Sequence, residues 1–346
     1  GIPLKKKILL LVGTDEESAN EDVSTYLKTH SAPDQTIVVD SNYPVVCAEK
    51  GWGGFWLQLA RDSTPPEGKG LLISDLRSGF SPSIVPEKAT AKLVPIGLST
   101  AESRAILEST RDAFVKKRHG GRLSIEVLND TLVVRAFGKS VHSSRPETGH
   151  NALMDLLVYL DSEVKPLRNE FALMARFAAT YIGFELHGHS LGIAYHDEFM
   201  GDVTVAGDMF HAADSAVTFM FNIRIPRGIE PATVEDSLSV RFQEFNDEHG
   251  TELAITSYIG SALYNDPNSP FVQRLLGIYN SVTGENRKAQ SIGGGTYAQR
   301  IPNAVVFGPA MPDEDYLGHQ PNEYIKISTL VRNIEILTHT LVEFGM

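Results

Sequence analysis

Cysteine is almost absent from this sequence. Cys47 is the single cysteine among 346 residues, so no disulfide can form within the chain, and we expect a reducing, cytoplasmic location. No apolar run reaches the length of a membrane-spanning helix, so we expect no membrane partner. Basic residues gather only in the short runs Lys5–Lys7 and Lys116–Arg118, and the net charge is −12. Both features argue against a nucleic-acid partner.

The remaining composition is that of a globular protein. With 42% hydrophobic and 21% charged residues, the chain can bury a sizeable core, and its length favours two domains. The sequence begins Gly1-Ile2-Pro3 and enters an apolar run almost at once. A domain rarely starts on a central strand without a lead-in, so we expect a segment of the protein to precede Gly1.

The first apolar run is followed by acids. Ile8–Gly13 has the length and composition of a strand buried on both faces, and Asp15–Glu17 comes directly after it. A helix is expected to include Val23–Leu27, with Ser18 or Asn20 as its N-cap. Acids at the carboxyl end of such a strand lie where open α/β sheets bind ligands. The alternative is a solvated turn whose charges favour the start of the helix.

Two patterns of secondary structure indicate two domains. Both ends of the chain alternate short apolar strands with amphipathic helices: Gln35–Asp40, Phe271–Val282, Ala304–Phe307 and Ile327–Phe344. The middle mixes longer strands and helices: Ala91–Ile96, Thr100–Lys116, Leu123–Leu128, Leu132–Phe137 and Asn151–Val164. We predict an α/β domain from residues 1–50 and 261–346, with a mixed, largely parallel sheet flanked by helices. Residues 51–260 are predicted to form an inserted α+β domain on an antiparallel sheet.

Three carboxylates and a histidine are candidates for a metal site. Glu16 and Glu17 follow one predicted strand, Asp40 ends the next, and His319 lies in a polar loop. Neighbouring side chains on extended backbone point in opposite directions, so Glu16 and Glu17 must have different roles. A mixed histidine and carboxylate set suits zinc, and an unligated glutamate is the usual general base for hydrolysis by a metal-bound water. No His-Glu-x-x-His spacing is present, and the alternative for His319 is a loop histidine that binds nothing.

Five motifs are more specific in combination than any of them alone. They are Gly-Thr-Asp-Glu-Glu-Ser at 13–18, Gly-Lys-Ser-Val-His-Ser-Ser at 138–144, Phe-Asn-Ile-Arg-Ile-Pro at 221–226, Gly-Gly-Gly-Thr-Tyr-Ala at 293–298 and Gly-His-Gln-Pro-Asn-Glu-Tyr-Ile at 318–325. In this order they resemble the co-catalytic zinc peptidases related to aminoacylase and carnosinase, metallopeptidase family 20. The Gly-Gly-Gly-Thr-Tyr-Ala form and the long insertion look most like the PepV-like bacterial dipeptidases.

The resemblance implies a role for each matching residue. Glu16 would be the general base that activates the metal-bound water, and His142 would stabilise the oxyanion. The metal ligands would be Glu17, Asp40 and His319. The carboxylate end of the substrate would be bound by Arg224, Gly294, Gly295 and Thr296. The resemblance also implies two zinc ions, with manganese or cobalt as alternatives, a discontinuous catalytic domain, a lid formed by the insertion, and a monomer.

The sequence departs from the family pattern in three places. The family's His-x-Asp motif and bridging aspartate belong upstream of Glu16, where this sequence has no histidine. The catalytic domain is therefore expected to be incomplete at its amino end, and the 346-residue chain can be inactive for that reason. Ser83 stands where relatives often carry a substrate-contacting asparagine, and Gln299 replaces a common arginine.

The predicted function is a zinc-dependent dipeptidase. It would hydrolyse the amide bond of short peptides with a free C-terminal carboxylate, such as Xaa-His or β-alanyl dipeptides. One alternative is a non-catalytic homologue that binds peptides or amino acids through Arg224 and the glycine-rich loop. Another is a different amidohydrolase of the family, such as a deacylase or desuccinylase, with the same chemistry and a different pocket.

Overall fold

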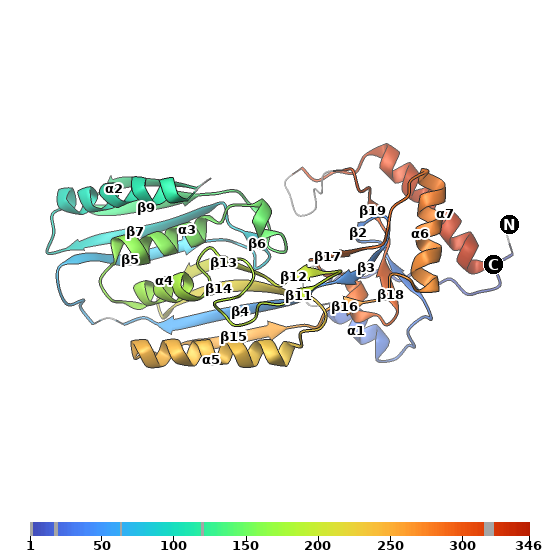
Figure 1. Cartoon of the computed structure of the whole chain (residues 1–346), viewed down its shortest axis with the longest axis horizontal. Helices are drawn as coiled ribbons and strands as arrows, with labels where there is room; N and C mark the ends of the chain where they lie inside the picture. The colour runs from blue at the N-terminus through green and yellow to red at the C-terminus, as the bar shows by residue number, and fades with distance from the viewer. Residues whose placement is uncertain (1–2, 17–19, 63, 119–120, 315–321) are drawn as a thin grey trace. The chain divides into compact units, whose positions relative to one another are not determined.

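The computed structural model describes residues 3–16, 20–62, 64–118, 121–314 and 322–346. The chain divides into two compact units. The first contains residues 1–51, 198–200 and 262–346, and the second contains residues 52–197 and 201–261. Each unit is built around its own sheet (Figure 1). Among the described residues, none of the helices combines the length and the apolar composition that a membrane span requires.

The first unit has a mixed α/β architecture, as the sequence predicted. Its strands are β1 (Thr36–Val38), β2 (Ser41–Asn42), β3 (Val46–Glu49), β16 (Leu263–Tyr264), β17 (Gln290–Ile292), β18 (Ala304–Val306) and β19 (Pro309–Ala310). Its helices are α1 (Glu21–Leu27), α6 (Pro270–Thr283), α7 (Ile327–Gly345) and the short η3 (Tyr297–Arg300). The main sheet has the order β1-β18-β3-β16, and β17 also pairs with β3. β1–β18 and β17–β3 are parallel pairs, whereas β18–β3 and β16–β3 are antiparallel.

Aromatic side chains fill the core beneath α6 and α7. Tyr43 is fully buried, its ring stacks on Tyr279, and Phe307 meets it edge-on. Its hydroxyl donates to Asn333 Oδ1 of α7 at 2.9 Å, so the polar end of this buried ring is satisfied. α6 begins at an N-cap serine, Ser269, and ends at a left-handed glycine, which explains its clean boundaries.

The prediction of a buried strand at Ile8–Gly13 is wrong. The segment forms no strand in the structure, and Leu10 and Val12 are 84% and 76% exposed. A strand needs a hydrogen-bonding partner and covered faces, and β1 at the end of the sheet pairs with β18 alone among the described strands. The residues just before this segment lie against the last residue of α7, where Lys5 N donates to Gly345 O at 2.7 Å.

The second unit is an α+β layer on an eight-stranded sheet. The sheet has the order β15-β4-β14-β13-β5-β7-β9-β8. Its strands are β4 (Gly51–Ala60), β5 (Gly70–Ser78), β7 (Lys88–Ile96), β8 (Arg122–Leu128), β9 (Thr131–Phe137), β13 (Thr204–Ala212), β14 (Ala216–Ile225) and β15 (Ala254–Ile259). Antiparallel pairs join β15 to β4 and connect β14 through β13, β5, β7 and β9 to β8. The predicted antiparallel sheet is therefore confirmed.

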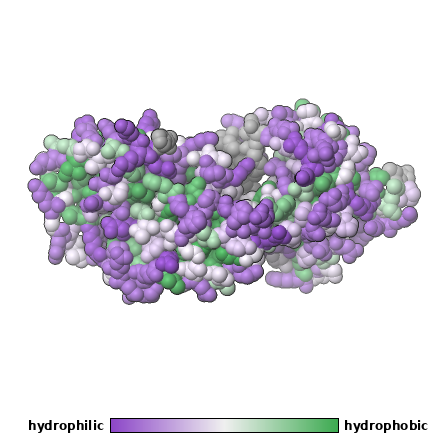
Figure 2. All heavy atoms as spheres, in the orientation of Figure 1, coloured by the Kyte–Doolittle hydropathy of each residue, from purple (hydrophilic) through white to green (hydrophobic). Residues whose placement is uncertain are grey.

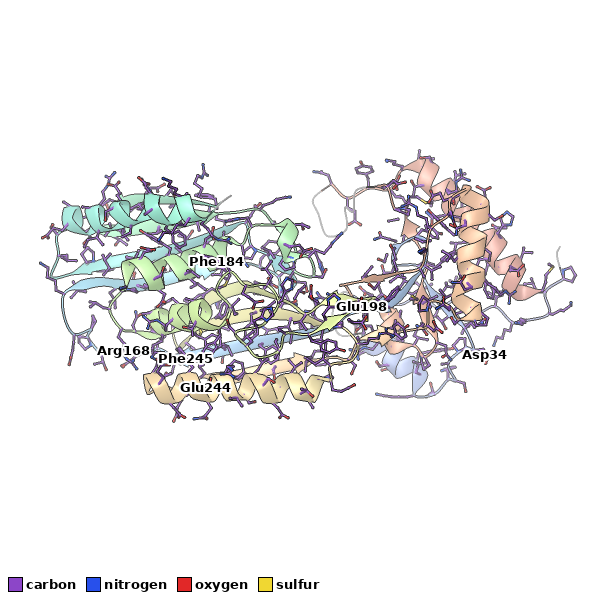
Figure 3. The ribbon with its side chains drawn as sticks, viewed as in Figure 1. Asp34, Arg168, Phe184, Glu198, Glu244 and Phe245 are labelled. Atoms are coloured by element: carbon purple, nitrogen blue, oxygen red, sulfur yellow. The ribbon has the colours of Figure 1, made fainter. Side chains whose placement is uncertain are left out.

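Helices cover one face of this sheet (Figure 1). They are α2 (Thr100–Lys117), α3 (Ala152–Tyr159), α4 (Glu170–Tyr181) and α5 (Pro231–His249), and a π turn, η2 (Leu160–Val164), extends α3. α5 places Phe245 in the core and Glu244 at the surface (Figure 3). Phe55 of β4 stacks on Phe221 of β14 beneath Phe242 of α5. Alternating apolar residues on the strands thus meet the apolar stripes of the helices, and hydrophilic residues dominate the visible surface (Figure 2).

Short elements complete the second unit. β6 (Ile84–Val85) pairs with β10 (Val141–His142), and η1 (Pro146–Thr148) follows. β11 (His196–Asp197) and β12 (Gly201–Asp202) form a hairpin. The tip of this hairpin, Glu198–Met200, belongs to the first unit (Figure 3), where Ser291 Oγ donates to Phe199 O at 3.0 Å.

The backbone of Gly79, directly after β5, lies very close to the backbone of β13. It has φ +70°, and a Cβ there would lie 1.8 Å from the backbone oxygen of Asp208. Gly201 has a similar φ of +76° but open space around it. We expect Gly201→Ala to cost about 1–2 kcal/mol of unfolding free energy from backbone strain alone, and Gly79→Ala to cost clearly more. Urea denaturation checks this, and equal losses in the two variants would contradict the close approach.

Candidate active site

The Gly13–Ser18 motif meets the Gly293–Ala298 motif within the first unit. A Cβ on Gly13 would clash with the hydroxyl and ring of Tyr297, so a larger residue at this position would force the Tyr297 side chain to move. Asp15 N donates to the Tyr297 hydroxyl at 3.0 Å, and this hydroxyl donates to Asp22 Oδ2 at 2.7 Å. Two motifs about 280 residues apart in the sequence are thereby joined through one tyrosine side chain.

Asp15 also serves the start of α1. Its Oδ2 accepts a hydrogen bond from Glu21 N at 2.8 Å, whereas Asn20 occupies the N-cap position without a side-chain capping bond. Thr14 N donates to Asp22 Oδ2 at 2.7 Å, and this backbone bond is the largest cause that lowers the pKa of Asp22. For Asp15, the interpretation of the acids as a helix-starting turn is therefore correct.

Glu49 is a buried carboxylate that the sequence analysis did not single out. It ends β3, is fully buried, and accepts two hydrogen bonds from Thr296, from its hydroxyl at 2.8 Å and from its backbone N–H at 3.1 Å. The pKa of Glu49 is raised to about 7: burial is the main cause, the two bonds from Thr296 oppose it, and the negative charges of Asp40 and Glu16 add to the increase. Glu16, Asp40 and Glu49 therefore belong to one negatively charged region of the first unit.

The glycine-rich loop before Thr296 is fastened to β3 on both sides. Lys50 N donates to Ile292 O at 3.0 Å ahead of the loop, and Gln299 Nε2 donates to Lys50 O at 3.0 Å beyond it. Gly294 and Gly295 lie between these anchors, and Thr296 Oγ1 also accepts from Ala298 N at 3.1 Å. The loop that the resemblance assigns to substrate binding is thus held by side chains and backbone of one strand end.

The donor types in this region suit a divalent cation. The negative charges of Asp40 and Glu16 raise the pKa of Glu49, and a bound cation would offset the repulsion among these carboxylates. Glu17 and His319, two of the predicted ligands, lie outside the described residues. Within the described ranges no three histidine, cysteine or acidic side chains gather as a metal-binding group. The chemistry of Glu16 and Asp40 therefore fits the implied zinc site, while its full ligand set is a matter for the proposal below.

The second unit assembles the remaining predicted residues around Ser83. His142 pairs with Ile84 in the β10–β6 ladder, and Ser143 N donates to Ser83 O at 2.8 Å. Arg224 on β14 donates from Nη2 to Ser83 Oγ and from Nε to Asn222 Oδ1, both at 3.3 Å. The arginine is 3% exposed. The structure therefore brings His142, Ser83 and Arg224 together, although 141 positions separate Ser83 from Arg224.

Two polar residues near Arg224 were missed. Asn222 donates from Nδ2 to Pro82 O at 3.0 Å and so fixes the loop that carries Ser83. Asp208 on β13 is fully buried, and burial raises its pKa well above the usual range. An acid within the apolar run from Val205 to Phe210 was the available signal, because charged residues are rarely fully buried without a role or a partner.

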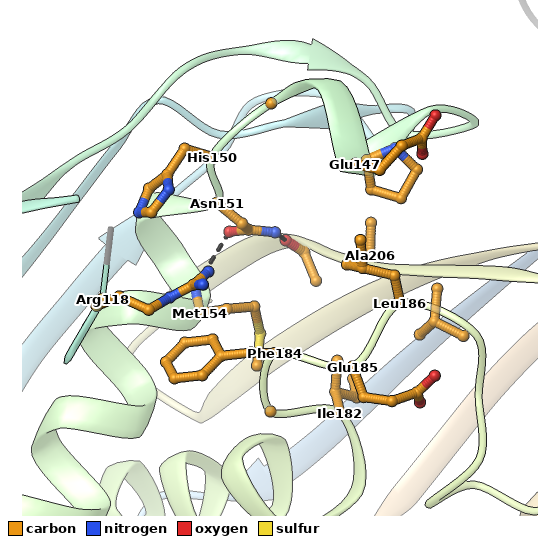
Figure 4. Close-up of a pocket in the computed structure, with 15 residues that line it drawn as sticks. Arg118, Glu147, His150, Asn151, Met154, Ile182, Phe184, Glu185, Leu186 and Ala206 are labelled. Carbon is orange, nitrogen blue, oxygen red and sulfur yellow. Dashed lines mark hydrogen bonds between the residues drawn. The ribbon is translucent and has the colours of Figure 1, made fainter. Parts of the chain in front are cut away.

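A separate pocket of about 240 Å³ lies in the second unit (Figure 4). Arg118 and His150 lie at its wall, and both are bound to Asp155, a residue 1% exposed. The guanidinium of Arg118 also lies 3.8 Å from the ring centroid of Phe184. Arg118, His150 and Asp155 are engaged with one another, which is typical of a structural network.

Comparison with known proteins assigns the chain to a family. The model of peptidase family M20/M25/M40 matches residues 1–343. The chain belongs to this peptidase family. It is 31% identical over 326 residues to "Putative dipeptidase SAR1836" of Staphylococcus aureus strain MRSA252, and equally to "Putative dipeptidase MW1694" of strain MW2. Each match covers 93% of this chain and 66% of the relative, so this M20 chain spans slightly less than two thirds of the relatives' length.

Solved structures show more distant likenesses to this M20 chain. Aminopeptidase PepT of Bacillus cereus is 12% identical, with a TM-score of 0.49, over 96% of this chain and 62% of the other. Aminoacylhistidine dipeptidase of Vibrio alginolyticus is 13% identical, with a TM-score of 0.43, over 90% of this chain and 66% of the other. The family assignment rests on the sequence matches, which are much stronger.

Glu49 gives the metal-free M20 chain a specific pH dependence. An acid whose pKa rises to about 7 on folding contributes stability that is complete below its unfolded pKa of about 4.5 and is lost as the pH rises through about 7. We expect the unfolding free energy to fall across this window and Glu49→Gln to remove that part of the slope. Urea denaturation at a series of pH values measures it, with the exposed Glu67→Gln as control. An unchanged slope in Glu49→Gln would contradict the raised pKa.

Proposed function

We propose that this chain carries the larger part of a zinc-dependent dipeptidase that hydrolyses short peptides with a free C-terminal carboxylate. The observation that carries the proposal is the 31% identity to dipeptidase-named relatives over 93% of the chain. Hydrolysis of such a substrate requires groups that act on the scissile amide and a group that binds the terminal carboxylate. The acids Glu16 and Asp40 of the first unit are suited to the first task, and the buried Arg224 of the second unit is suited to the other. Xaa-His and β-alanyl dipeptides are the proposed substrates, and a monomer in the cytoplasm is the proposed state.

In the proposed mechanism Glu16 transfers a proton between the attacking water and the leaving amine. Glu17, Asp40 and His319 would hold zinc, which when bound supplies a Lewis acid and lowers the pKa of water. Glu16 takes the proton from the attacking water and delivers it to the leaving amine. Thr296 gives both of its hydrogen-bond donors to Glu49 and so holds the glycine-rich loop in place, from which the backbone N–H groups of Gly294 and Gly295 would donate to the substrate near its carboxylate.

Residues of the second unit act on the substrate's charge. Arg224 binds the terminal carboxylate, for which a planar guanidinium provides two parallel donors. His142 donates to the oxyanion that develops at the scissile carbonyl. The hydrogen bond between His142 Nδ1 and Ser144 Oγ, at 2.7 Å, fixes the ring so that its other nitrogen has a defined direction.

Glu16 is the first residue to test. Zinc, manganese or cobalt is added to the 346-residue chain and to a version extended at its amino end, and metal content and hydrolysis of β-alanyl-histidine are measured. We expect hydrolysis in the extended version and a loss of about 10²–10⁴-fold in Glu16→Ala, because general bases contribute about that much. Glu21→Ala, an exposed acid on α1, is the matched control and should retain activity.

The other outcomes separate the alternatives. Two inactive, metal-free proteins that still bind a dipeptide would overturn the enzyme proposal and favour a binding protein. Hydrolysis by the 346 residues alone, lost in Glu16→Ala, would support the enzyme and contradict the expectation that upstream ligands are needed. Hydrolysis of acylated amino acids without any hydrolysis of dipeptides would favour a deacylase.

Arg224 should decide carboxylate recognition. We expect Arg224→Met to weaken the binding of a dipeptide by about 10–100-fold, because a charge-assisted hydrogen bond contributes about 1.5–3 kcal/mol. The same dipeptide with an amidated C-terminus should bind weakly to both proteins. Calorimetry measures both ligands, and Arg104→Met on the surface of α2 is the control. Equal losses for the acid and the amide would show that Arg224 does not recognise the carboxylate.

A further inference from the structure

Asp208 lies in a bulge of β13, the strand that pairs with β14, and β14 carries Arg224, the residue proposed to bind the substrate carboxylate. The register between β13 and β14 shifts between Gly207 and Met209, so Asp208 is the extra residue of β13. Its side chain is fully buried, and neither carboxylate oxygen has a hydrogen-bond partner among the described residues. The hydroxyl of Ser143 is likewise buried without a partner there. A buried ionised carboxylate without hydrogen bonds is very unfavourable, so the protonated acid is the form that fits this environment.

Arg224 is the charged group that acts on Asp208. Burial raises the pKa of Asp208 and outweighs the lowering effect of the Arg224 guanidinium; the Ser143 hydroxyl lies close enough to lower this pKa as well, although it makes no hydrogen bond of good geometry. The other charged groups on the neighbouring elements are engaged or exposed. Asp75 on β5 pairs with Arg77 and Lys92, His142 on β10 bonds to Ser144, and His211 on β13 is exposed. Gly79 approaches only the backbone of Asp208.

We propose that Asp208 regulates the carboxylate site through a proton: it holds the proton while a ligand carboxylate is bound to Arg224 and, once ionised, competes with that ligand for the guanidinium. This inference rests on the proposed role of Arg224 in binding the substrate carboxylate. It adds a pH-sensitive internal competitor to that site.

The competition follows from charge balance. With Asp208 protonated, Arg224 keeps a net positive charge that attracts a ligand carboxylate. With Asp208 ionised, the guanidinium is neutralised from within, and a second carboxylate would meet a buried negative charge. Above its pKa, Asp208 is ionised in the ligand-free protein and must regain its proton when the ligand binds. Affinity is therefore highest below the pKa of Asp208. Above that pKa the Kd rises by up to about tenfold per pH unit.

The competing interpretation is a structural ion pair. In that case Asp208 would be ionised in the free and the ligand-bound protein, and its charge would hold Arg224 in place at every pH. Ligand binding would then involve no proton at this position. Replacing Asp208 by neutral asparagine would change affinity by the same factor at all pH values.

Calorimetry with N-acetylalanine separates the two interpretations. This probe has one titratable group, its carboxylate, and N-acetylalanine amide is the uncharged control. Binding to the 346-residue chain is measured from about pH 5 to about pH 10 in buffers of different ionisation enthalpy, which report the protons taken up. We expect uptake approaching one proton at high pH in the wild type. Asp208→Asn should show no such uptake and should retain the low-pH affinity throughout, whereas the control Asp75→Asn should behave as the wild type.

Each result has a defined meaning. Wild-type binding without proton uptake, together with loss of binding in Arg224→Met, would overturn the role of Asp208 and leave the proposed function intact. Binding unaffected by Arg224→Met would overturn the proposed function and this inference with it. Proton uptake that persists in Asp208→Asn would assign the proton to another group and overturn the inference. If Asp208→Asn fails to fold, Asp208→Ser is used for the same comparison.

Discussion

The burial of one face of the eight-stranded sheet beneath four helices is the constraint on which the second unit depends. Phe55, Phe221 and Phe242 are part of this layer, and their packing holds β4, β14 and α5 together. Because side chains alternate along a strand, fixing Phe221 inside the layer places Asn222 and Arg224 on the opposite face. The position of the arginine is thus a consequence of apolar packing on the other side of its own strand.

Each unit buries a carboxylate, Glu49 in the first and Asp208 in the second, and the two differ in their hydrogen bonds. In the first, Glu49 is buried but takes two hydrogen bonds from Thr296, and the pKa shift that remains reflects desolvation and the nearby acids. In the second, Asp208 is buried without such bonds, and the Arg224 guanidinium is the opposite charge that acts on it. Both carboxylates are costly to bury, and both lie on elements that carry residues predicted to bind the substrate or that interact with such elements.

The first unit also leaves apolar surface uncovered. α7 buries Ile336 against the core, while Ile327, Val331 and Ile334 are exposed along the helix. Leu10 and Val12 in the segment before the acids are exposed as well. The spacing of apolar residues shows which segments are suited to a core, but it does not show which other elements cover them. For this reason it predicted the helix α7 correctly and a strand at Ile8–Gly13 wrongly.

The sequence by itself determined the fold class, several helices and strands, and the family, because these depend on local periodicity and on ordered motifs. The helix predicted at Thr100–Lys116 is α2, and the strand predicted at Ala91–Ile96 lies within β7. Only the tertiary structure decided that Ser83 lies against Arg224, that Tyr297 joins the first motif, and that Glu49 and Asp208 are buried. These facts depend on strand register and on desolvation by residues distant in the sequence, and neither quantity is encoded in any local pattern.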